Sequence, residues 1–307
     1  MKTNKKIAYF VNNPRNILLG VVYHLSPILP DKLYLKLLYR LHIGKRLNLK
    51  NPQGYNEKLQ WLKLYNHRPE YTQMVDKYAV KDYVKTVIGN KYVIPTLGVW
   101  DSFEDINFNS LPNQFVLKTT HGGGGGGVVI CRNKQTFDFA YARNRLNRSM
   151  ADDCYTKTRE WPYKYVPHRI IAEQLLEVRP GEGDDLPDYK FFCFDGAVKA
   201  LFVGSERQTG DVKFDFFDAD FNHLDIVQSH PMSGHEIQKP KHFEEMKELA
   251  SKLSKGLPHA RIDLYDTENG VYFGEITFFH HGGISSFHPE KWDLIFGSWL
   301  RLPPKTV

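Results

Sequence analysis

The chain has 307 residues, of which 41% are hydrophobic and 25% are charged. This composition is typical of a globular protein and excludes a disordered chain, and the length is sufficient for one or two hydrophobic cores. The formal net charge of +6 favours an anionic partner such as a nucleotide, an acidic glycan or a membrane surface. The basic residues are dispersed rather than interleaved with aromatic residues, so we expect no nucleic-acid binding.

Cysteine spacing and hydropathy indicate the compartment. Cys131, Cys154 and Cys193 form no C-x-x-C pair, which argues against a disulfide framework and a thiolate zinc site. The uncharged stretch near the start, residues 16–30, is too short to span a bilayer. We therefore expect a soluble protein of the reducing cytoplasm.

Two helices are predicted between residues 14 and 50, because leucine and valine recur there at helical spacing and Pro27, Pro30 and Asp31 mark a break. The second helix should begin near Asp31. The basic residues of these helices allow two interpretations, peripheral contact with an anionic membrane or an ordinary solvated face on helices that pack against the core.

Two further helices and a strand are predicted before the middle of the chain. One helix opens through Asn56, and the other spans residues 71–88 with Asp76 and Lys77 in its first turns. A strand is expected within residues 92–100.

The segment Gln114–Arg132 contains six consecutive glycines between two apolar runs, namely Gly122, Gly123, Gly124, Gly125, Gly126 and Gly127. It predicts a strand, a loop and a second strand. Glycines let backbone amides approach a ligand closely, and Lys118 at the end of the first strand adds a fixed positive charge, so the pattern favours a nucleotide phosphate. A flexible β-hairpin without a ligand is the alternative.

The second half of the chain alternates helices and hairpins. A helix is predicted over 138–150, a loop or broken helix over 153–169, a strand over 169–176 and an amphipathic helix over 244–257. Turn signals predict strands at 189–194 and 198–204, at 212–217, and at 261–265 and 271–277.

Strand parity sorts the side chains of the last hairpin. Arg261 and Asp263 share one face of their strand, and Glu275 and Thr277 share one face of the next. If the two strands pair antiparallel, Asp263 and Glu275 stand side by side and repel each other unless a cation lies between them. Magnesium takes such carboxylates together with phosphate oxygens, whereas solvated acids on a surface hairpin are the alternative.

An ordered series of phrases resembles the TupA-like (teichuronopeptide biosynthesis) family of ATP-grasp proteins. The phrases are N-P-x-x-Y-N-E-K-L-Q-W-L-K, D-K-Y-A-V, I-P-x-L-G-V-W-D, L-P-x-x-F-V-L-K-x-x-H, R-x-D-L-Y and F-G-E-I-T-F. The resemblance implies an α+β ATP-grasp fold, with two α+β subdomains clasping ATP after an N-terminal helical region. The expected division is a helical region over 1–70 and an ATP-grasp domain over 71–302, with a flap subdomain near 115–170 and a metal-binding subdomain over 171–302.

The resemblance also implies a nucleotide site. Lys77 and Lys118 would contact the phosphates of ATP, and the loop Gly122–Gly127 would close over them. The adenine hinge matches Glu173, Gln174 and Leu176, which would act mainly through their backbone groups. Asp188 matches an acid that holds the ribose hydroxyls.

The remaining implied residues serve the metal and the reaction. Asp263, Glu275 and Thr277 match the ligands of Mg²⁺, although many relatives have asparagine in place of the threonine. Lys190 would face the phosphates or the acceptor. Arg261 would hold the acceptor or the charge that develops during transfer.

The implied activity is an ATP- and Mg²⁺-dependent ligation of a carboxylate to an amine through an acyl phosphate, in the biosynthesis or modification of a cell-envelope or capsular polysaccharide. An acidic or amino-bearing glycan, or an amino acid, would be the acceptor. We expect the enzyme in the cytoplasm, with peripheral association at the inner face of the membrane as an option through the basic N-terminal helices.

Two other hypotheses stay open. A kinase of the same fold would phosphorylate a glycan hydroxyl and would need a general base, for which His121, His280 and His281 are candidates. A nucleotide- or glycan-binding protein without activity is the second, although the presence of both lysines and both acids argues against it.

Overall fold

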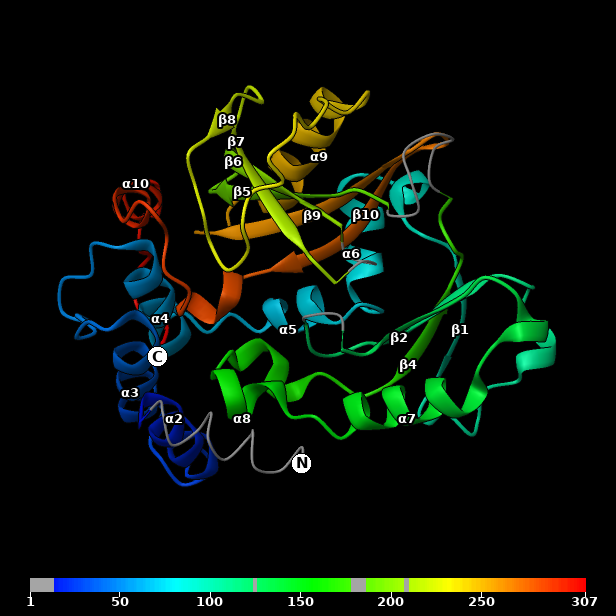
Figure 1. Ribbon diagram of the computed structural model, residues 1–307, viewed down its shortest axis with the longest axis horizontal. Helices are drawn as coiled ribbons and strands as arrows, with labels where there is room; N and C mark the ends of the chain where they lie inside the picture. The colour runs from blue at the N-terminus through cyan, green and yellow to red at the C-terminus, as the bar shows by residue number, and fades with distance from the viewer. Residues whose placement is uncertain (1–13, 124–125, 178–185, 207–209) are drawn as a thin grey trace.

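The computed structural model describes residues 14–123, 126–177, 186–206 and 210–307. Two antiparallel sheets dominate these residues, one above the other in Figure 1. The lower sheet has the strand order β1-β4-β2-β3, and the upper sheet has the order β10-β9-β5-β6-β7-β8. The predicted mixture of helices with antiparallel strands is therefore confirmed.

The element bounds follow the chain. The lower strands are β1 (Thr96–Trp100), β2 (Phe115–Thr119), β3 (Val128–Cys131) and β4 (Ile170–Glu173). The upper strands are β5 (Asp188–Phe194), β6 (Ala197–Ser205), β7 (Lys213–Asp218), β8 (His223–Leu224), β9 (Ala260–Thr267) and β10 (Gly270–Thr277). The α-helices are α2 (Pro14–His24), α3 (Asp31–Ile43), α4 (Tyr55–Tyr65), α5 (Glu70–Val75), α6 (Val80–Val87), α7 (Phe139–Met150), α8 (Cys154–Thr158), α9 (Phe243–Ser254) and α10 (Lys291–Trp299). The 3₁₀ turns are η1 (Asn90–Tyr92), η2 (Phe108–Ser110), η3 (Lys134–Thr136), η4 (Trp161–Tyr165) and η5 (His280–Gly283).

The lower sheet has its own core. β2 and β3 pair across the glycine loop, and β4 pairs with both β2 and β1. Helix α7, which Asp138 caps by accepting a hydrogen bond from the Tyr141 amide, packs its apolar face on this sheet through Ala142 and Leu146. The apolar face of one amphipathic helix thus covers one face of the sheet.

The upper sheet carries the largest core. All seven residues of β5 are buried, and this strand lies between β9 and β6. Asp195 and Gly196 both have positive φ, which is the geometry that the predicted Asp-Gly hairpin turn requires. Helices α9 and α10 pack against this core, and α5 and α6 lie between the two sheets in Figure 1.

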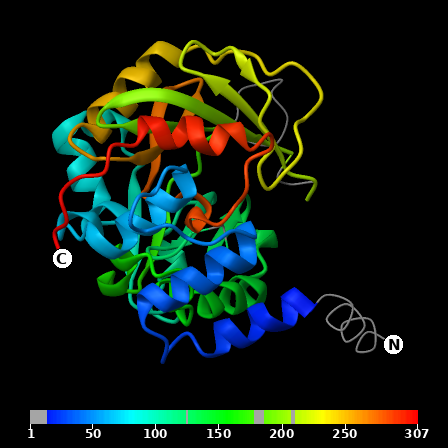
Figure 2. The same cartoon turned by 90° about the vertical axis from the view of Figure 1, so that its left-hand side faces the viewer.

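A third cluster of buried residues joins α2 and α3 at the edge of the molecule, where Figure 2 shows them below the rest of the fold. The two predicted N-terminal helices are confirmed, and the second begins at Asp31 as expected. Within the described residues, none of the helices is both long and apolar enough to cross a membrane.

The single helix predicted over 71–88 is wrong, because the chain leaves the helical conformation at Asp76, between α5 and α6. The Asp76 carboxylate accepts hydrogen bonds from the amides of Tyr78 and Ala79, and the Lys77 amide donates to the Thr120 carbonyl 2.9 Å away. These bonds replace helical ones and tie the break to the end of β2. Two strands are also shorter than expected, since β1 begins at Thr96 and β4 ends at Glu173.

Candidate active site

The two late acids lie opposite each other. β9 and β10 pair antiparallel, so that Glu275 faces Asp263, as the sequence analysis expects, and Thr277 faces Arg261. The register shifts between Phe273 and Glu275, which makes Gly274 the extra residue of a bulge. This bulge brings Glu275, rather than its neighbour, alongside Asp263.

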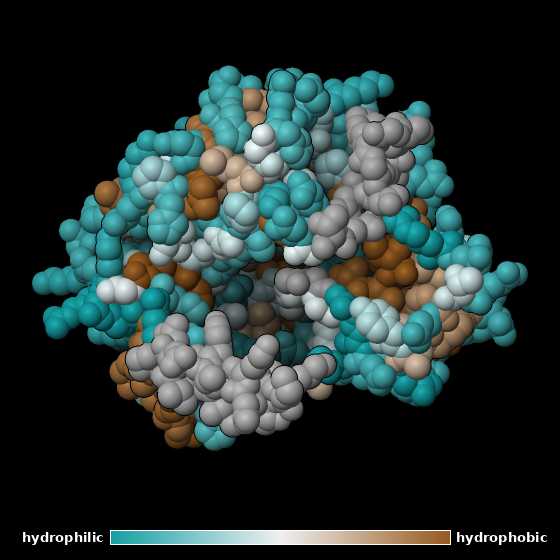
Figure 3. All heavy atoms as spheres, in the orientation of Figure 1, coloured by the Kyte–Doolittle hydropathy of each residue, from teal (hydrophilic) through white to brown (hydrophobic). Residues whose placement is uncertain are grey.

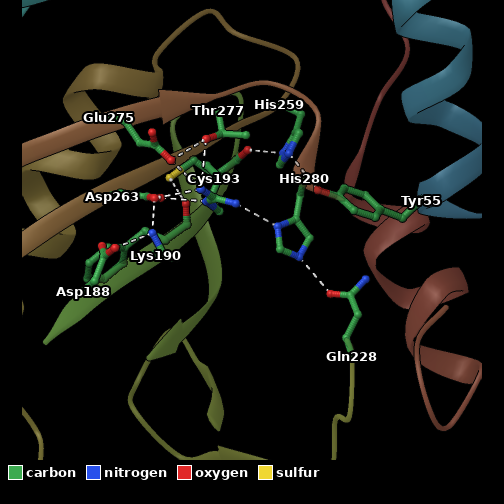
Figure 4. A network of polar contacts seen from close by, with 12 residues as sticks. Tyr55, Asp188, Lys190, Cys193, Gln228, His259, Asp263, Glu275, Thr277 and His280 are labelled. Atoms are coloured by element: carbon green, nitrogen blue, oxygen red, sulfur yellow. Dashed lines mark hydrogen bonds and ion pairs between the residues drawn. The ribbon is translucent and has the colours of Figure 1, made fainter. Parts of the chain in front are cut away.

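Arg261 is the centre of the upper half of the site, and Figure 4 labels its partners Asp263, Glu275, Thr277 and His280. Its guanidinium donates to both oxygens of Asp263 at 2.7 and 2.8 Å, to Glu275 Oε1 at 2.9 Å and to Thr277 Oγ1 at 3.0 Å. A further contact of 3.0 Å joins it to His280 Nδ1. Burial alone would lower the pKa of Arg261, but the neighbouring carboxylates raise it, so this side chain is a permanent cation.

Lys190 adds a second cation to the same face. Its ammonium forms ion pairs with Asp263 and, at 2.6 Å, with Asp188. Both acids are buried, with 1% and 4% of their surface exposed. Lys190 on β5 therefore contacts both Asp188, the residue predicted to hold the ribose, and Asp263, a predicted ligand of Mg²⁺.

Glu275 is the more open of the two metal candidates, with 31% of its side chain exposed. Burial raises the pKa of Glu275, but the charges of Lys77, Lys190 and Arg261 outweigh burial and lower the pKa to about 2. The carboxylate is thus ionised at neutral pH and lies within electrostatic reach of cations from both halves of the molecule.

The lower half of the site is a buried triad. Glu173, at the end of β4, forms ion pairs with Lys118 at 2.7 Å and with Lys81 at 2.5 Å. Burial raises the pKa of Glu173, but the two lysines outweigh burial and lower it. Lys81 was missed in the sequence analysis because a lysine within a helix is ordinarily solvated.

Lys77 links the two halves. Its ammonium donates to the carbonyl of Gly122 at 2.5 Å, at the start of the glycine loop. Burial lowers the pKa of Lys77, Glu275 raises it, and Lys118 lowers it further. The charges of Lys118 on the lower sheet and Glu275 on the upper sheet thus both act on Lys77. Figure 3 shows the surface hollowed between the two halves of the molecule.

The glycine loop is open where the structure describes it. Added Cβ atoms at Gly122, Gly123 and Gly126 would meet nothing within 4 Å, whereas one at Gly127 would lie 2.2 Å from Thr119 Oγ1. Packing thus requires a glycine only at the last of these positions, and the space over the others is available to a ligand. The predicted phosphate contacts of Gly124 and Gly125 lie outside the described residues.

Four further residues were predicted to belong to the site, namely Gln174, Leu176, His121 and His280. The Gln174 amide donates to the Pro95 carbonyl at 3.0 Å, and Leu176 is partly exposed next to it. His121 is buried, donates a hydrogen bond from Nε2 to the Ser149 carbonyl at 3.0 Å, and stacks on His168 with ring centroids 3.5 Å apart. His280 is buried between Arg261 and Gln228.

The donor set fits magnesium better than a protein-only metal cage. Within the described part of the chain, no three His, Cys, Asp or Glu side chains are grouped to hold a metal ion. Two adjacent carboxylates and a hydroxyl on β9 and β10 are too few for such a cage. They are the number that Mg²⁺ takes when substrate phosphates and water complete its shell.

The chain is similar to one family of known proteins and to several solved structures. A family model described as "TupA-like ATPgrasp" matches residues 57–301. Solved structures that resemble the chain include a D-alanine–D-alanine ligase from Helicobacter pylori (17% identity, TM-score 0.45, covering 82% of this chain and 68% of that one). They also include the D-alanine–D-alanine ligase from Bacillus anthracis (16%, 0.38, 74% and 60%) and the ATP-grasp ligase PsnB with its precursor peptide and AMPPNP (14%, 0.38, 73% and 57%). The chain thus spans about 60% of the length of the Bacillus anthracis ligase. No curated protein matches the chain.

Proposed function

This chain belongs to the TupA-like ATP-grasp family, and on that premise we propose that it is an ATP- and Mg²⁺-dependent ligase that joins a carboxylate to an amine. The fold and the family imply ATP binding and ligase-type chemistry. The reaction itself, its magnesium dependence and the substrates are our proposal.

One observation carries the proposal, which is the convergence of cations and acids from the two sheets. Lys118 and Lys81 come from the lower half, Arg261 and Lys190 from the upper half, and Lys77 stands between them. These five cations face four carboxylates, those of Glu173, Asp188, Asp263 and Glu275, so a net positive charge is left for an anion to balance. A triphosphate supplies that anion, and the glycine loop beside Lys77 supplies backbone amides.

The residues suggest how the chain would act on its substrates. The lysines would position the nucleotide and neutralise charge on the transferring phosphoryl group while a substrate carboxylate attacks it to give an acyl phosphate. Asp263, Glu275 and Thr277 would hold Mg²⁺, which would add further charge neutralisation at the phosphates. Closure of the glycine loop would exclude water, which would otherwise hydrolyse the acyl phosphate.

The substrate class follows from the family resemblance. Because that family is associated with teichuronopeptide biosynthesis, we propose that the protein decorates a cell-envelope or capsular polysaccharide. A uronic acid is a suitable carboxylate, and an amino acid or amino sugar is a suitable amine. The kinase alternative has less support, because His280 is bound on both ring nitrogens and its pKa is lowered well below the usual range by burial and by neighbouring cations and histidines.

A product assay tests this function. Purified protein would be incubated with Mg²⁺, ATP, glucuronate and a panel of amino acids, and the products would be identified by mass. ADP with an amide is the expected result, and Asp263→Asn and Glu275→Gln should abolish it without unfolding the protein. ADP with a phosphoester would establish a kinase instead, and nucleotide binding without turnover would establish a binding protein.

We also propose that the enzyme works at the inner face of the membrane. Residues 1–50 contain ten lysines and arginines and one acid, a net charge of +9, so the remaining 257 residues carry a net charge of −3. On α2, the side chains of Ile17, Leu18 and Val21 are each about half exposed, and Ile28 after it is 76% exposed. Apolar side chains next to concentrated positive charge are the features that bind an anionic bilayer surface.

A further inference from the structure

A chain of buried polar side chains leads from the proposed site into the body of the molecule. Arg261 contacts His280, and His280 contacts Gln228, which lies in the segment between β8 and α9 (Figure 4). All three residues are buried. Gln228 thus belongs to the surroundings of the site, although no motif of the sequence indicates it.

The backbone on either side of Gln228 is held in place. Val227 and His288 exchange two backbone hydrogen bonds of 2.8 and 2.9 Å, and the Ser229 hydroxyl lies 2.8 Å from the Ser285 hydroxyl. Ser229 has a φ of 62°, which residues other than glycine seldom adopt because it costs free energy. The contacts of its two neighbours therefore fix the position of Gln228.

The direction of each hydrogen bond in the chain follows from what its partner can do. The Ser285 carbonyl only accepts, so the Gln228 carboxamide turns Nε2 to it, at 3.1 Å, and Oε1 to His280. His280 Nε2 must then carry the proton that it donates to Oε1, at 2.8 Å. Nδ1 of the neutral ring is left as an acceptor, and Arg261 Nη1, which only donates, lies 3.0 Å from it. Gln228 therefore selects the tautomer of His280 that can bind Arg261.

The surroundings of His280 favour the neutral ring that this arrangement requires. The ring centroids of Phe192 and Phe202 lie 4.8 and 5.4 Å from that of His280. Burial lowers the pKa of His280 most, and the charge of Arg261 is among those that lower it further. A protonated ring would point an N–H group at the guanidinium, donor against donor.

His280 holds a part of Arg261 that the acids do not. Asp263, Glu275 and Thr277 accept hydrogen bonds from Nε and Nη2 of the guanidinium. Among the residues that the structure describes, His280 alone accepts from Nη1. A guanidinium bound only along its Nε–Nη2 edge can still tilt about that edge. The contact at Nη1 prevents this tilt.

We propose that Gln228 is a positioning residue of the ligase reaction, which acts through the tautomer of His280 to fix the guanidinium of Arg261. This inference rests on the proposed function, in which Arg261 meets the charge that develops during phosphoryl transfer. In the other tautomer, the Nδ1–H group would face Nη1–H and turn the guanidinium away. Gln228 and His280 therefore act as one unit, so that loss of one removes the effect of the other.

A double-mutant cycle tests this unit. Gln228→Met keeps the length of the side chain but removes the acceptor for His280 Nε2. His280→Asn keeps an acceptor for Arg261, because the asparagine oxygen lies as far along the side chain as Nδ1, but it cannot reach Gln228. Gln228→Met should lower the turnover number for amide formation about tenfold, as within one hydrogen-bond network. In the His280→Asn background it should change turnover by less than about twofold.

Nitrogen-15 NMR of histidine-labelled protein at neutral pH reports the tautomer without any turnover. The His280 signals, identified by their loss in His280→Asn, should show the proton on Nε2 in the wild type, and Gln228→Met should lose this single tautomer. Gln135→Met makes the same substitution at an exposed glutamine in η3 and should change neither tautomer nor turnover. Thermal unfolding identifies the variants that are folded at the assay temperature, and Gln228→Asn, whose amide is too short for both contacts, replaces Gln228→Met if that variant is not.

Three results would overturn the role of Gln228. They are wild-type turnover in Gln228→Met, the same loss in both backgrounds, which a purely structural role would give, and a wild-type His280 with its proton on Nδ1. If the wild-type protein forms no amide at all, the proposed function fails, and this inference fails with it whatever the tautomer.

Discussion

Glu173 shows how one residue organises the lower half of the site. Its carboxylate is shared between Lys118 and Lys81, and all three side chains are largely buried. The family resemblance places this residue in a hinge that acts through backbone groups, so its side chain had no assigned role. The structure adds that role, because the carboxylate fixes the lysine predicted to contact a phosphate.

Replacing Glu173 by glutamine should destabilise the protein in a pH-dependent way. The variant leaves two buried ammonium groups without their shared carboxylate, and breaking such a pair costs about 3–5 kcal/mol. The pKa of Glu173 is lowered from 4.5 in the folded protein. Its contribution to stability is therefore full above pH 4.5 and is lost as the pH falls through the lower folded value.

Urea unfolding of both proteins at neutral pH and at several values below pH 4.5 measures this effect. The gap in the free energy of unfolding should be largest at neutral pH and should shrink on acidification. Glu248→Gln, which removes an exposed partner of Lys252, is the matched control and should change the free energy of unfolding little. A gap that stays constant with pH would show that packing, and not charge, causes the loss.

At the scale of elements, the β9–β10 hairpin was predictable and the break at Asp76 was not. Alternation along a strand fixes which side chains share a face, so the grouping of Arg261 with Asp263 and of Glu275 with Thr277 followed from spacing, whereas the bulge that sets Glu275 opposite Asp263 did not. The break between α5 and α6 depends on a hydrogen bond from Lys77 to Thr120, 43 positions further along the chain, and helical periodicity contains no sign of such a contact.

The buried polar face of α4 was also not predicted, although the sequence contained a signal for it. Asn56, Gln60 and Lys63 are polar residues at helical spacing, and all three are buried. A row of polar side chains along one face of a helix normally indicates that this face is exposed to solvent. Here α4 packs on η5, and Gln60 and Lys63 donate hydrogen bonds to the carbonyls of that turn.

Gly274→Ala tests the bulge that aligns the two acids. An added Cβ would lie 3.0 Å from the Asp263 carbonyl oxygen and 3.1 Å from the Tyr265 ring. We expect a loss of about 1–3 kcal/mol in the free energy of unfolding. Small displacements of reacting groups cost about 100-fold in rate. The turnover of the variant should therefore fall further than the loss of folded protein alone would explain.

Thermal unfolding and steady-state kinetics of the same preparation compare the two effects. Gly20→Ala in α2, where an added Cβ meets nothing within 4 Å, is the control and should leave both quantities unchanged or slightly raise stability. Wild-type turnover in Gly274→Ala would show that the bulge does not set the site.

At the scale of the whole molecule, positive charge and exposed apolar side chains both occur in the N-terminal part of the chain. We predict that the protein sediments with vesicles containing phosphatidylglycerol, less with phosphatidylcholine alone, and less at high salt. Ile17→Ser with Val21→Ser, and separately Lys32→Gln with Lys36→Gln, should each weaken sedimentation. The exposed pair Lys85→Gln and Lys252→Gln, elsewhere on the surface, is the control.

Equal sedimentation with both kinds of vesicle, or sedimentation that neither N-terminal double variant changes, would contradict membrane association. Ligase activity is independent of this result, because the variants lie on α2 and α3, which form a buried cluster of their own.

The central claim is that cations of the lower sheet and acids of the upper sheet bind one magnesium nucleotide together. Calorimetric titration with a non-hydrolysable ATP analogue, with and without Mg²⁺, tests it most directly. We predict that the wild-type protein binds the analogue more tightly with Mg²⁺, that Lys118→Ala loses at least about tenfold in affinity, and that Asp263→Asn and Glu275→Gln lose the magnesium dependence. No binding by the wild-type protein, or wild-type affinity and magnesium dependence in all three variants, would contradict the claim.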